Sequence, residues 1–95
     1  MIGVIADAGL TTAMPPPPAW RTARPTDLRI EGSYQRDLST RGKRLIRRIV
    51  ANWDWAKFKP PVCAETPEGL FVIDGQHTAI AAASHPKIKM IPVMV

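Results

Sequence analysis

The sequence predicts an α+β domain, in which helices pack on a small β-sheet, and three observations support this fold class. Short runs rich in β-branched and apolar residues, typical of strands, occur at 62–64, 70–73 and 90–95. Apolar residues between 40 and 53 recur at helical spacing, and an alanine-rich stretch follows residue 75. A chain of 95 residues, 45% of them apolar, has room for one globular domain and is not typical of disorder.

The first 26 residues differ in composition from the rest. Apolar residues at 1–14 are interrupted by Asp7, follow no basic segment, and fall short of the roughly 20 needed to cross a bilayer. Pro15 to Pro18 should form a polyproline II spacer. We expect residues 1–26 to be a proline-rich arm and residues 27–95 the domain, in a cytoplasmic protein without a membrane partner.

The arm has two alternative roles. It could serve as a ligand for an SH3-like domain, or it could pack through Trp20, Arg21 and Arg24 onto the domain or a neighbouring chain.

Regular structure is expected from Leu28. The alternation in Leu28–Ile30 predicts a short, half-buried strand, and Gly32-Ser33 predicts a turn into Tyr34, Gln35 and Arg36. A helix then begins at Ser39 or Thr40, either of which can cap it, and closes near Asn52. Its apolar face is expected to comprise Leu45, Ile46, Ile49, Val50 and Trp53.

The opposite side of this helix is basic. It carries Arg41, Lys43, Arg44, Arg47 and Arg48. Such a row can contact the phosphates of DNA or RNA, although it can also be a solvated face. The net charge of +5 and pI near 10 favour an anionic partner, with simple solubility as the alternative.

The second half of the domain is expected to begin with a hairpin. Val62–Ala64 and Leu70–Ile73 would be its strands, joined by a turn at 66–69. Cys63, the single cysteine, excludes an internal disulfide and is expected to be a core residue. After an alanine-rich helix ended by Pro86, residues 90–95 would form a final strand. That strand would leave an exposed sheet edge or lack a C-terminal continuation, so a homodimer or an incomplete domain is expected.

The junction from Asp74 to Thr78 is the predicted ligand site. A strand passes through Gly75 directly into a helix, whose first N–H groups can hold a phosphate. Gly75 would permit a positive φ or close backbone approach. Gln76 and Thr78 offer neutral donors, and His77 can donate to an anion or carry a proton. Asp74 could accept from a ribose hydroxyl or hold Mg²⁺, or it could cap the helix.

These residues also carry a resemblance to a known superfamily. Asp74-Gly75-Gln76-His77, followed by Ala81, resembles the motif of ParB N-terminal domains and sulfiredoxins, and is closer to the Asp-Gly-Gln-His-Arg variant of phage and mobile-element proteins. Tyr34-Gln35-Arg36 and Phe58–Val62 resemble further segments, so the match spans 28–95. The resemblance implies a small mixed sheet with packed helices. It also implies a nucleotide-phosphate site formed by the junction, with Tyr34, Gln35, Arg36 and Arg41 nearby.

Two departures narrow the activity that the resemblance implies. Sulfiredoxins have their reactive cysteine at the position of Gln76 and a phosphate-binding arginine at that of Thr78, so sulfiredoxin activity is disfavoured. The ParB proteins that bind CTP have arginines at the positions of His77 and Thr78. Arg36 is therefore the preferred cationic ligand outside the junction.

Three functions are compatible with the sequence. The first is a ParB-like module that binds a nucleotide or phosphate, with a nucleoside triphosphate and Mg²⁺ as its ligands, and that is linked to DNA binding. The second is a nucleotide triphosphatase or metal-assisted nuclease that uses Asp74 and His77. The third is a degenerate protein-interaction domain. The side chains give no metal-ligand spacing of their own.

Overall fold

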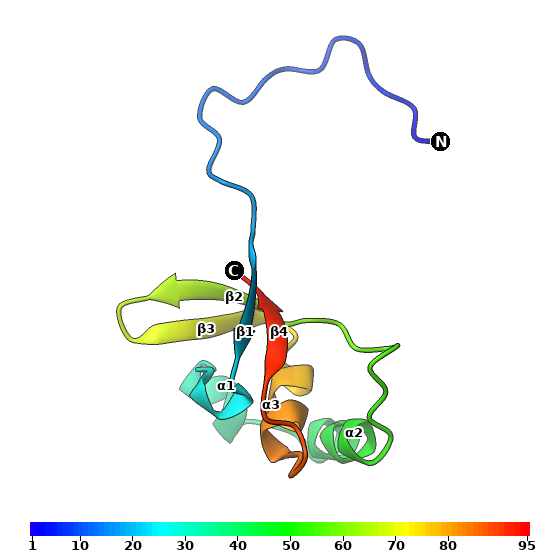
Figure 1. Ribbon diagram of the computed structural model, residues 1–95, viewed down its shortest axis with the longest axis vertical. Helices are drawn as coiled ribbons and strands as arrows, with labels where there is room; N and C mark the ends of the chain where they lie inside the picture. Colours follow the sequence, from blue (N-terminus) through cyan, green and yellow to red (C-terminus); the bar gives the residue numbers. More distant parts are fainter.

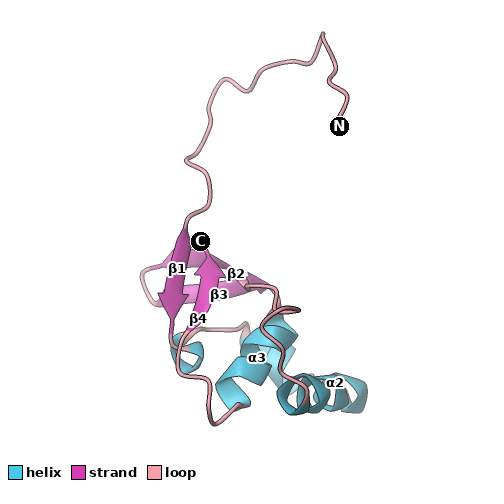
Figure 2. Cartoon of the chain, turned by 45° about the vertical axis from the view of Figure 1, so that its right-hand side comes forward, coloured by secondary structure: helices cyan, strands magenta, loops and turns pink.

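The structure, a computed structural model, describes residues 1–95 with the exception of the Arg36 side chain. Its elements are β1 (Trp20–Ala23), the 3-10 helix η1 (Pro25–Asp27), α1 (Gly32–Arg36), α2 (Thr40–Ala51), β2 (Val62–Thr66), β3 (Gly69–Asp74), α3 (Gln76–Ser84) and β4 (Ile91–Met94). The helices gather on one side of a four-stranded mixed sheet, and the N-terminal segment leaves the opposite side (Figures 1 and 2). The predicted α+β class and mixed sheet are confirmed.

The sheet has the strand order β1-β4-β2-β3. β1 pairs with β4 and β2 with β3 in antiparallel fashion, whereas β2 and β4 run parallel. The last strand therefore lies in the middle of the sheet, and the expectation that it forms an exposed edge is wrong. The reason is a strand that the sequence did not predict: β1, from the N-terminal segment, pairs along β4 from Trp20 opposite Met94 to Ala23 opposite Ile91.

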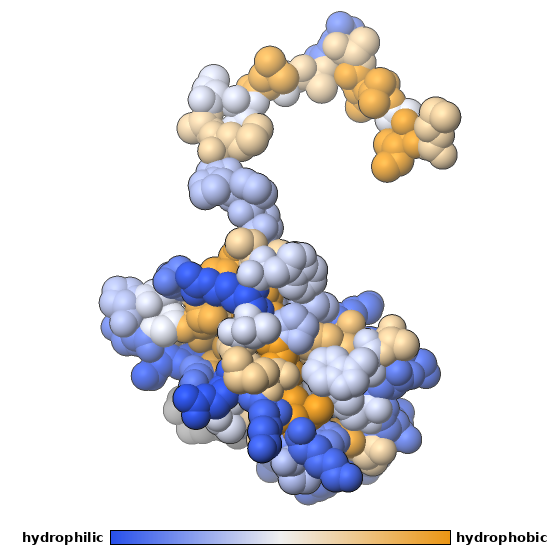
Figure 3. Space-filling model, viewed as in Figure 1, coloured by the Kyte–Doolittle hydropathy of each residue, from blue (hydrophilic) through white to orange (hydrophobic). Residues whose placement is uncertain are grey.

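The segment assigned to the arm contributes this strand. Ala19 and Val95 also exchange backbone hydrogen bonds of 2.9 Å in both directions, which extends the pairing by one residue. The residues before Ala19 form no helix or strand and extend away from the sheet, with apolar side chains open to solvent (Figure 3). These exposed side chains belong to Met1, Ile2, Val4, Ile5, Leu10 and Met14.

Two predictions for the segment that follows β1 are wrong in detail. The expected strand at Leu28–Ile30 is a single bridge, in which Arg29 pairs with Phe71 at the outer side of β3. The expected turn at Gly32-Ser33 is the first part of α1. This helix begins there because the Glu31 carboxylate accepts hydrogen bonds from the backbone N–H groups of residues 33 and 34, at 3.3 and 3.1 Å.

The central helix follows its prediction closely at both ends. The Ser39 hydroxyl accepts a hydrogen bond from the Gly42 N–H at 3.0 Å and caps α2, and Asn52 ends it. The side chain of Ile46, within α2, is buried. Leu45 is 41% exposed, so its assignment to the core face is wrong.

The core lies between the sheet and the helices. It is formed by Cys63, Val72, Ala79, Ala82, Ile91 and Val93, with Trp53, Phe58 and Leu70 among the half-buried residues around it. Both hairpin strands, the turn between them and the central apolar strand occur where the sequence predicts them. The small side chains of α3 let this helix pack close to the sheet.

Gly75 connects β3 to α3 in the left-handed conformation, with φ of 84°. A Cβ here would lie 3.1 Å from Pro61 Cα, so the close approach that requires glycine is to the chain's own backbone.

We predict that Gly75→Ala lowers the free energy of unfolding by at least about 1–2 kcal/mol, the cost of a left-handed non-glycine residue. Urea denaturation would measure this loss.

The matched control is Gly9→Ala, because a Cβ at Gly9 meets nothing within 4 Å. This variant should unfold at the urea concentration of the parent protein. Equal stability of both variants would show that the turn does not require glycine.

Candidate functional site

The start of α3 lacks the aspartate cap that the sequence allows. The Asp74 carboxylate accepts a hydrogen bond from the Gly75 N–H at 2.9 Å, so it bonds at the turn rather than capping the helix as an N-cap aspartate would. The Gln76 side-chain amide donates to the Ile73 carbonyl at 3.3 Å. In the described part of the chain, no side chain caps this helix. Its first N–H groups are therefore not occupied by a cap.

His77, in the first turn of α3, contacts Tyr34 of α1. The Tyr34 hydroxyl lies 3.2 Å from His77 Nδ1 and 3.3 Å from Nε2, and the two rings meet edge to face with centroids 5.9 Å apart. Residues 43 positions apart in the sequence, both predicted to belong to the site, are thus brought together. The contact fixes the position of the imidazole beside α2.

Glu31 fixes the position of Tyr34 in turn. Its carboxylate accepts from the Ser33 hydroxyl and from the N–H groups of Ser33 and Tyr34. These hydrogen bonds, that of the Ser33 hydroxyl first, lower the pKa of Glu31. Because the pKa of Glu31 is lower in the folded protein than in the unfolded chain, this cap adds to the free energy of unfolding at pH values above the unfolded pKa. That contribution is lost as the pH falls through the folded pKa.

Gly42 allows α2 to approach α3 closely at His77. A Cβ at this position would lie 3.4 Å from His77 Nε2 and 3.2 Å from Leu38 Cδ2. The absence of a side chain leaves room for the imidazole against the first turn of α2. His77 consequently faces the same hollow as Arg41, Arg44 and Arg48 of that helix.

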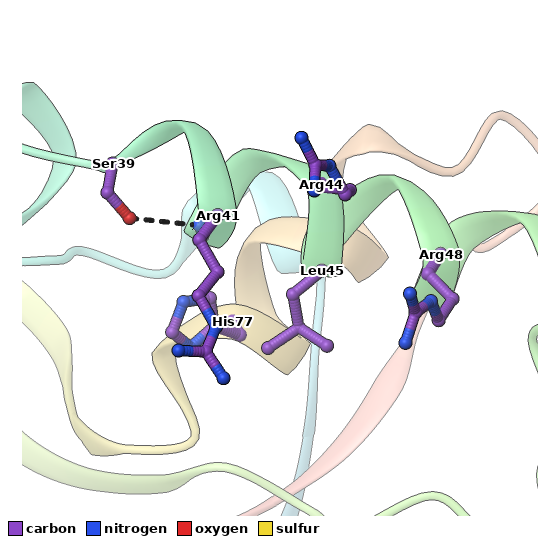
Figure 4. A pocket seen from close by; sticks show the side chains of 7 residues that line it. Ser39, Arg41, Arg44, Leu45, Arg48 and His77 are labelled. Carbon is purple, nitrogen blue, oxygen red and sulfur yellow. Dashed lines mark hydrogen bonds between the residues drawn. The ribbon is translucent and has the colours of Figure 1, made fainter.

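This hollow, which we call the arginine hollow, has a volume of about 460 Å³ and is open to solvent. It is lined by Ser39, Arg41, Gly42, Arg44, Leu45, Arg48 and His77. Arg41, Leu45 and Arg48 extend to the side of α2 on which His77 lies, whereas Arg44 extends to the other side and forms the rim (Figure 4).

The arginine hollow is positively charged and has no acidic lining among the described residues. The two ion pairs found in the described part of the protein lie elsewhere, between Arg21 and Glu65 and between Arg24 and Asp27. An anion would therefore meet guanidinium groups that are not engaged by carboxylates of the described residues. The planar guanidinium fork is suited to bind phosphate through two parallel hydrogen bonds.

A second hollow of about 340 Å³ adjoins the first, because Arg48 lines both. We call it the lysine hollow. It is lined by Arg48, Ile49, Asn52, Trp53, Asp54, Lys57, Phe58, Lys59 and Thr78. Thr78, predicted to bind phosphate beside His77, thus faces the second hollow.

The remaining predicted site residues are distributed over other surfaces. Gln35 lines a depression on another side of α3, together with Ile80 and Ala83. Lys43 and Arg47 are exposed on α2 and line neither the arginine hollow nor the lysine hollow. Asp74 is exposed and does not share the arginine hollow with His77. The Arg36 side chain, the preferred cationic ligand, lies outside the described part of the structure.

Leu45 lines the arginine hollow, as do Ser39 and Gly42, although the sequence predicts none of these three as site residues. The apolar character of Leu45 predicts a core position, yet it lies four residues after Arg41 and three before Arg48. These spacings place all three on one helical face. The arrangement of an exposed apolar side chain between two arginines could have been found by comparing helical positions rather than residue types.

Cys63 is buried, as predicted for a core residue. Desolvation by burial raises the pKa of its thiol, which disfavours the reactive thiolate. Within the described residues, no three His, Cys, Asp or Glu side chains gather as a metal site would require. None of the helices described for this chain combines the length and apolar character needed to span a bilayer.

No protein-family model matches the chain, and comparisons with curated proteins and with solved structures give no match.

The Tyr34–His77 contact can be tested by a double-mutant cycle. We predict that Tyr34→Phe and His77→Gln are coupled by about 0.5–1.5 kcal/mol, the range for one hydrogen bond, because each substitution removes the same interaction. Urea denaturation of the two single variants and the double variant would give the coupling. Strictly additive losses would contradict the contact.

The thiol of Cys63 should react slowly in the folded protein. At pH 8 we predict alkylation by iodoacetamide at least about tenfold slower than in urea, because burial hinders access and the raised pKa reduces the thiolate fraction. The raised folded pKa also means that stability falls as pH rises above the unfolded thiol pKa of roughly 8.5. Mass spectrometry would follow alkylation, and equal rates in both conditions would contradict burial.

Proposed function

We propose that this protein is a nucleotide- or phosphate-binding module and that the phosphates bind in the arginine hollow. The observation that carries the proposal is the arrangement of Arg41 and Arg48 on the side of α2 that faces His77. Two forked cations and an imidazole around an open hollow provide charge-assisted hydrogen-bond donors for phosphate oxygens.

The size and composition of the hollow favour a nucleotide over inorganic phosphate. A volume of about 460 Å³ is within the range of small-ligand sites. Leu45 offers an apolar surface between the arginines, on which part of a base or sugar can pack. The ligand would therefore place its charge against the guanidinium groups and an apolar part against Leu45.

The resemblance of Asp74-Gly75-Gln76-His77 to the ParB and sulfiredoxin motif supports the same class of ligand. In the junction, Gly75 leads directly into α3, and the first N–H groups of a helix are suited to hold a phosphate. His77 belongs to both the motif and the arginine hollow, so it connects the two lines of support. We propose that the module acts within a phage or mobile-element protein linked to DNA.

The enzyme alternative has less support. Asp74 does not line the hollow that His77 lines, and its carboxylate already accepts a hydrogen bond from the Gly75 N–H. Mg²⁺ would arrive with a nucleoside triphosphate, because the hollow has no described carboxylate to bind the ion and magnesium is commonly held by substrate phosphates. We propose binding rather than hydrolysis as the function of the site.

Thermal unfolding tests this proposal directly. ATP, CTP, GTP and tripolyphosphate are each added, with and without Mg²⁺. A ligand at 100 times its dissociation constant stabilises a protein by roughly 2.7 kcal/mol, which should raise Tm by about 10 °C or more in a domain of this size. Stabilisation by nucleotides and not by tripolyphosphate would show that the nucleoside part, base or sugar, contributes.

The matched variants are neighbours on the same helix. Arg48→Gln should reduce the Tm shift strongly, as should Arg41→Gln, because each removes a cation from the hollow. Arg47→Gln removes the same charge from a residue outside the hollow and should retain most of the shift. The absence of a shift with every ligand, or equal losses in all three variants, would refute the proposed site.

A further inference from the structure

The cations along α2 continue beyond the reach of a single phosphate group. Arg41 and Arg48 are separated by about 10 Å along the helix axis, from the rise of about 1.5 Å per residue. Beyond the end of α2, Lys57 and Lys59 line the lysine hollow, which shares Arg48 with the arginine hollow. The two hollows thus share Arg48 on their lining, and we call them together the basic groove.

An exposed aromatic side chain lies next to this groove. Trp55 is 52% exposed. Its ring meets Trp53 edge to face with centroids 5.2 Å apart, and Phe58 at 5.0 Å. Trp53 and Phe58 themselves line the lysine hollow. Trp55 is thus supported by two packed aromatic rings, while half of its surface remains available for a ligand.

We propose that the ligand of the basic groove is a single-stranded nucleic acid, whose phosphates follow Arg41, Arg48, Lys57 and Lys59 and one of whose bases stacks on Trp55. This inference rests on the proposed phosphate site and specifies its ligand. Cations that line the basic groove and an exposed aromatic ring packed on two of its lining residues are the two features by which proteins bind single strands, namely backbone neutralisation and base stacking.

The exposed tryptophan favours a single strand over a duplex. The bases of a duplex are stacked on one another, and their faces are not available to a side chain at the surface. A duplex could contact the cations but would gain nothing from Trp55. Among the described residues that line the groove, Asp54 is the one with an acidic side chain; it accepts a hydrogen bond from the Ala56 N–H at 2.9 Å and so helps to shape the loop that carries the tryptophan.

Fluorescence anisotropy with labelled dT20 and U20 tests the inference on the full chain. Both oligonucleotides should bind more tightly than the corresponding 20-base-pair duplex and more tightly than ATP. Neutralisation of about four phosphates predicts that log K falls with log salt with a slope of about −3, at about −0.7 for each phosphate of a single strand. Lys57→Gln and Lys59→Gln should each reduce the magnitude of the slope by about 0.7.

Trp55 gives the sharper test. Trp55→Ala should weaken binding of the single strand roughly 5- to 150-fold, the range for loss of one stacked base, and leave duplex binding unchanged. Trp55→Phe should restore part of the affinity, which a variant that merely unfolds would not do. Trp20→Ala is the matched control, because Trp20 is also exposed, at 62%, but lies on β1. It should bind the single strand as the parent does.

The outcomes separate this inference from the proposed function. If ATP raises Tm through Arg41 and Arg48, but dT20 and U20 bind no more tightly than ATP or the duplex, the single-strand inference fails and the nucleotide site stands. Equal losses in Trp55→Ala and Trp20→Ala would also overturn the inference. If neither nucleotides nor oligonucleotides bind, both proposals fail.

Discussion

The close approach of α2 to α3 is the constraint on which the candidate site depends. Gly42 leaves room for the His77 ring, and the small side chains of α3 bring that helix near both α2 and the sheet. Without this approach, His77 would not share a hollow with the exposed Arg41 and Arg48. The polar groups of the hollow are therefore positioned by residues that have almost no side chain.

A second constraint acts from the other side of His77. Tyr34 contacts the imidazole from α1, a helix of only five residues that begins where Glu31 supplies hydrogen-bond acceptors. A short helix has little stability of its own, so its cap and its contact with α3 support each other. The site thus combines one rigid wall, formed by α2, with one wall whose geometry depends on a few hydrogen bonds.

The sequence predicted most of the local structure, because the relevant signals are local. Ser39 caps a helix, the left-handed Gly75 ends a strand, and the apolar runs form strands as periodicity indicates. The errors have a common cause, which is that they depend on distant parts of the chain. Leu45 is apolar but lies on the open face of α2, and Arg29 finds a partner for one bridge only. The hollow that Arg41 and His77 share depends on how α2 packs against α3, which no local signal in the sequence specifies.

The position of β4 in the middle of the sheet affects how the protein can fold during synthesis. Its neighbours are β2 and β1, and the β1–β4 pair joins strands that are far apart in the sequence, since β1 comprises residues 20–23 and β4 residues 91–94. The β2–β3 hairpin can form early from local contacts, but β1 cannot pair with β4 until residues 91–94 have been synthesised. The first strand must therefore wait unpaired, and a folding rate limited by this long-range closure is expected for such a topology.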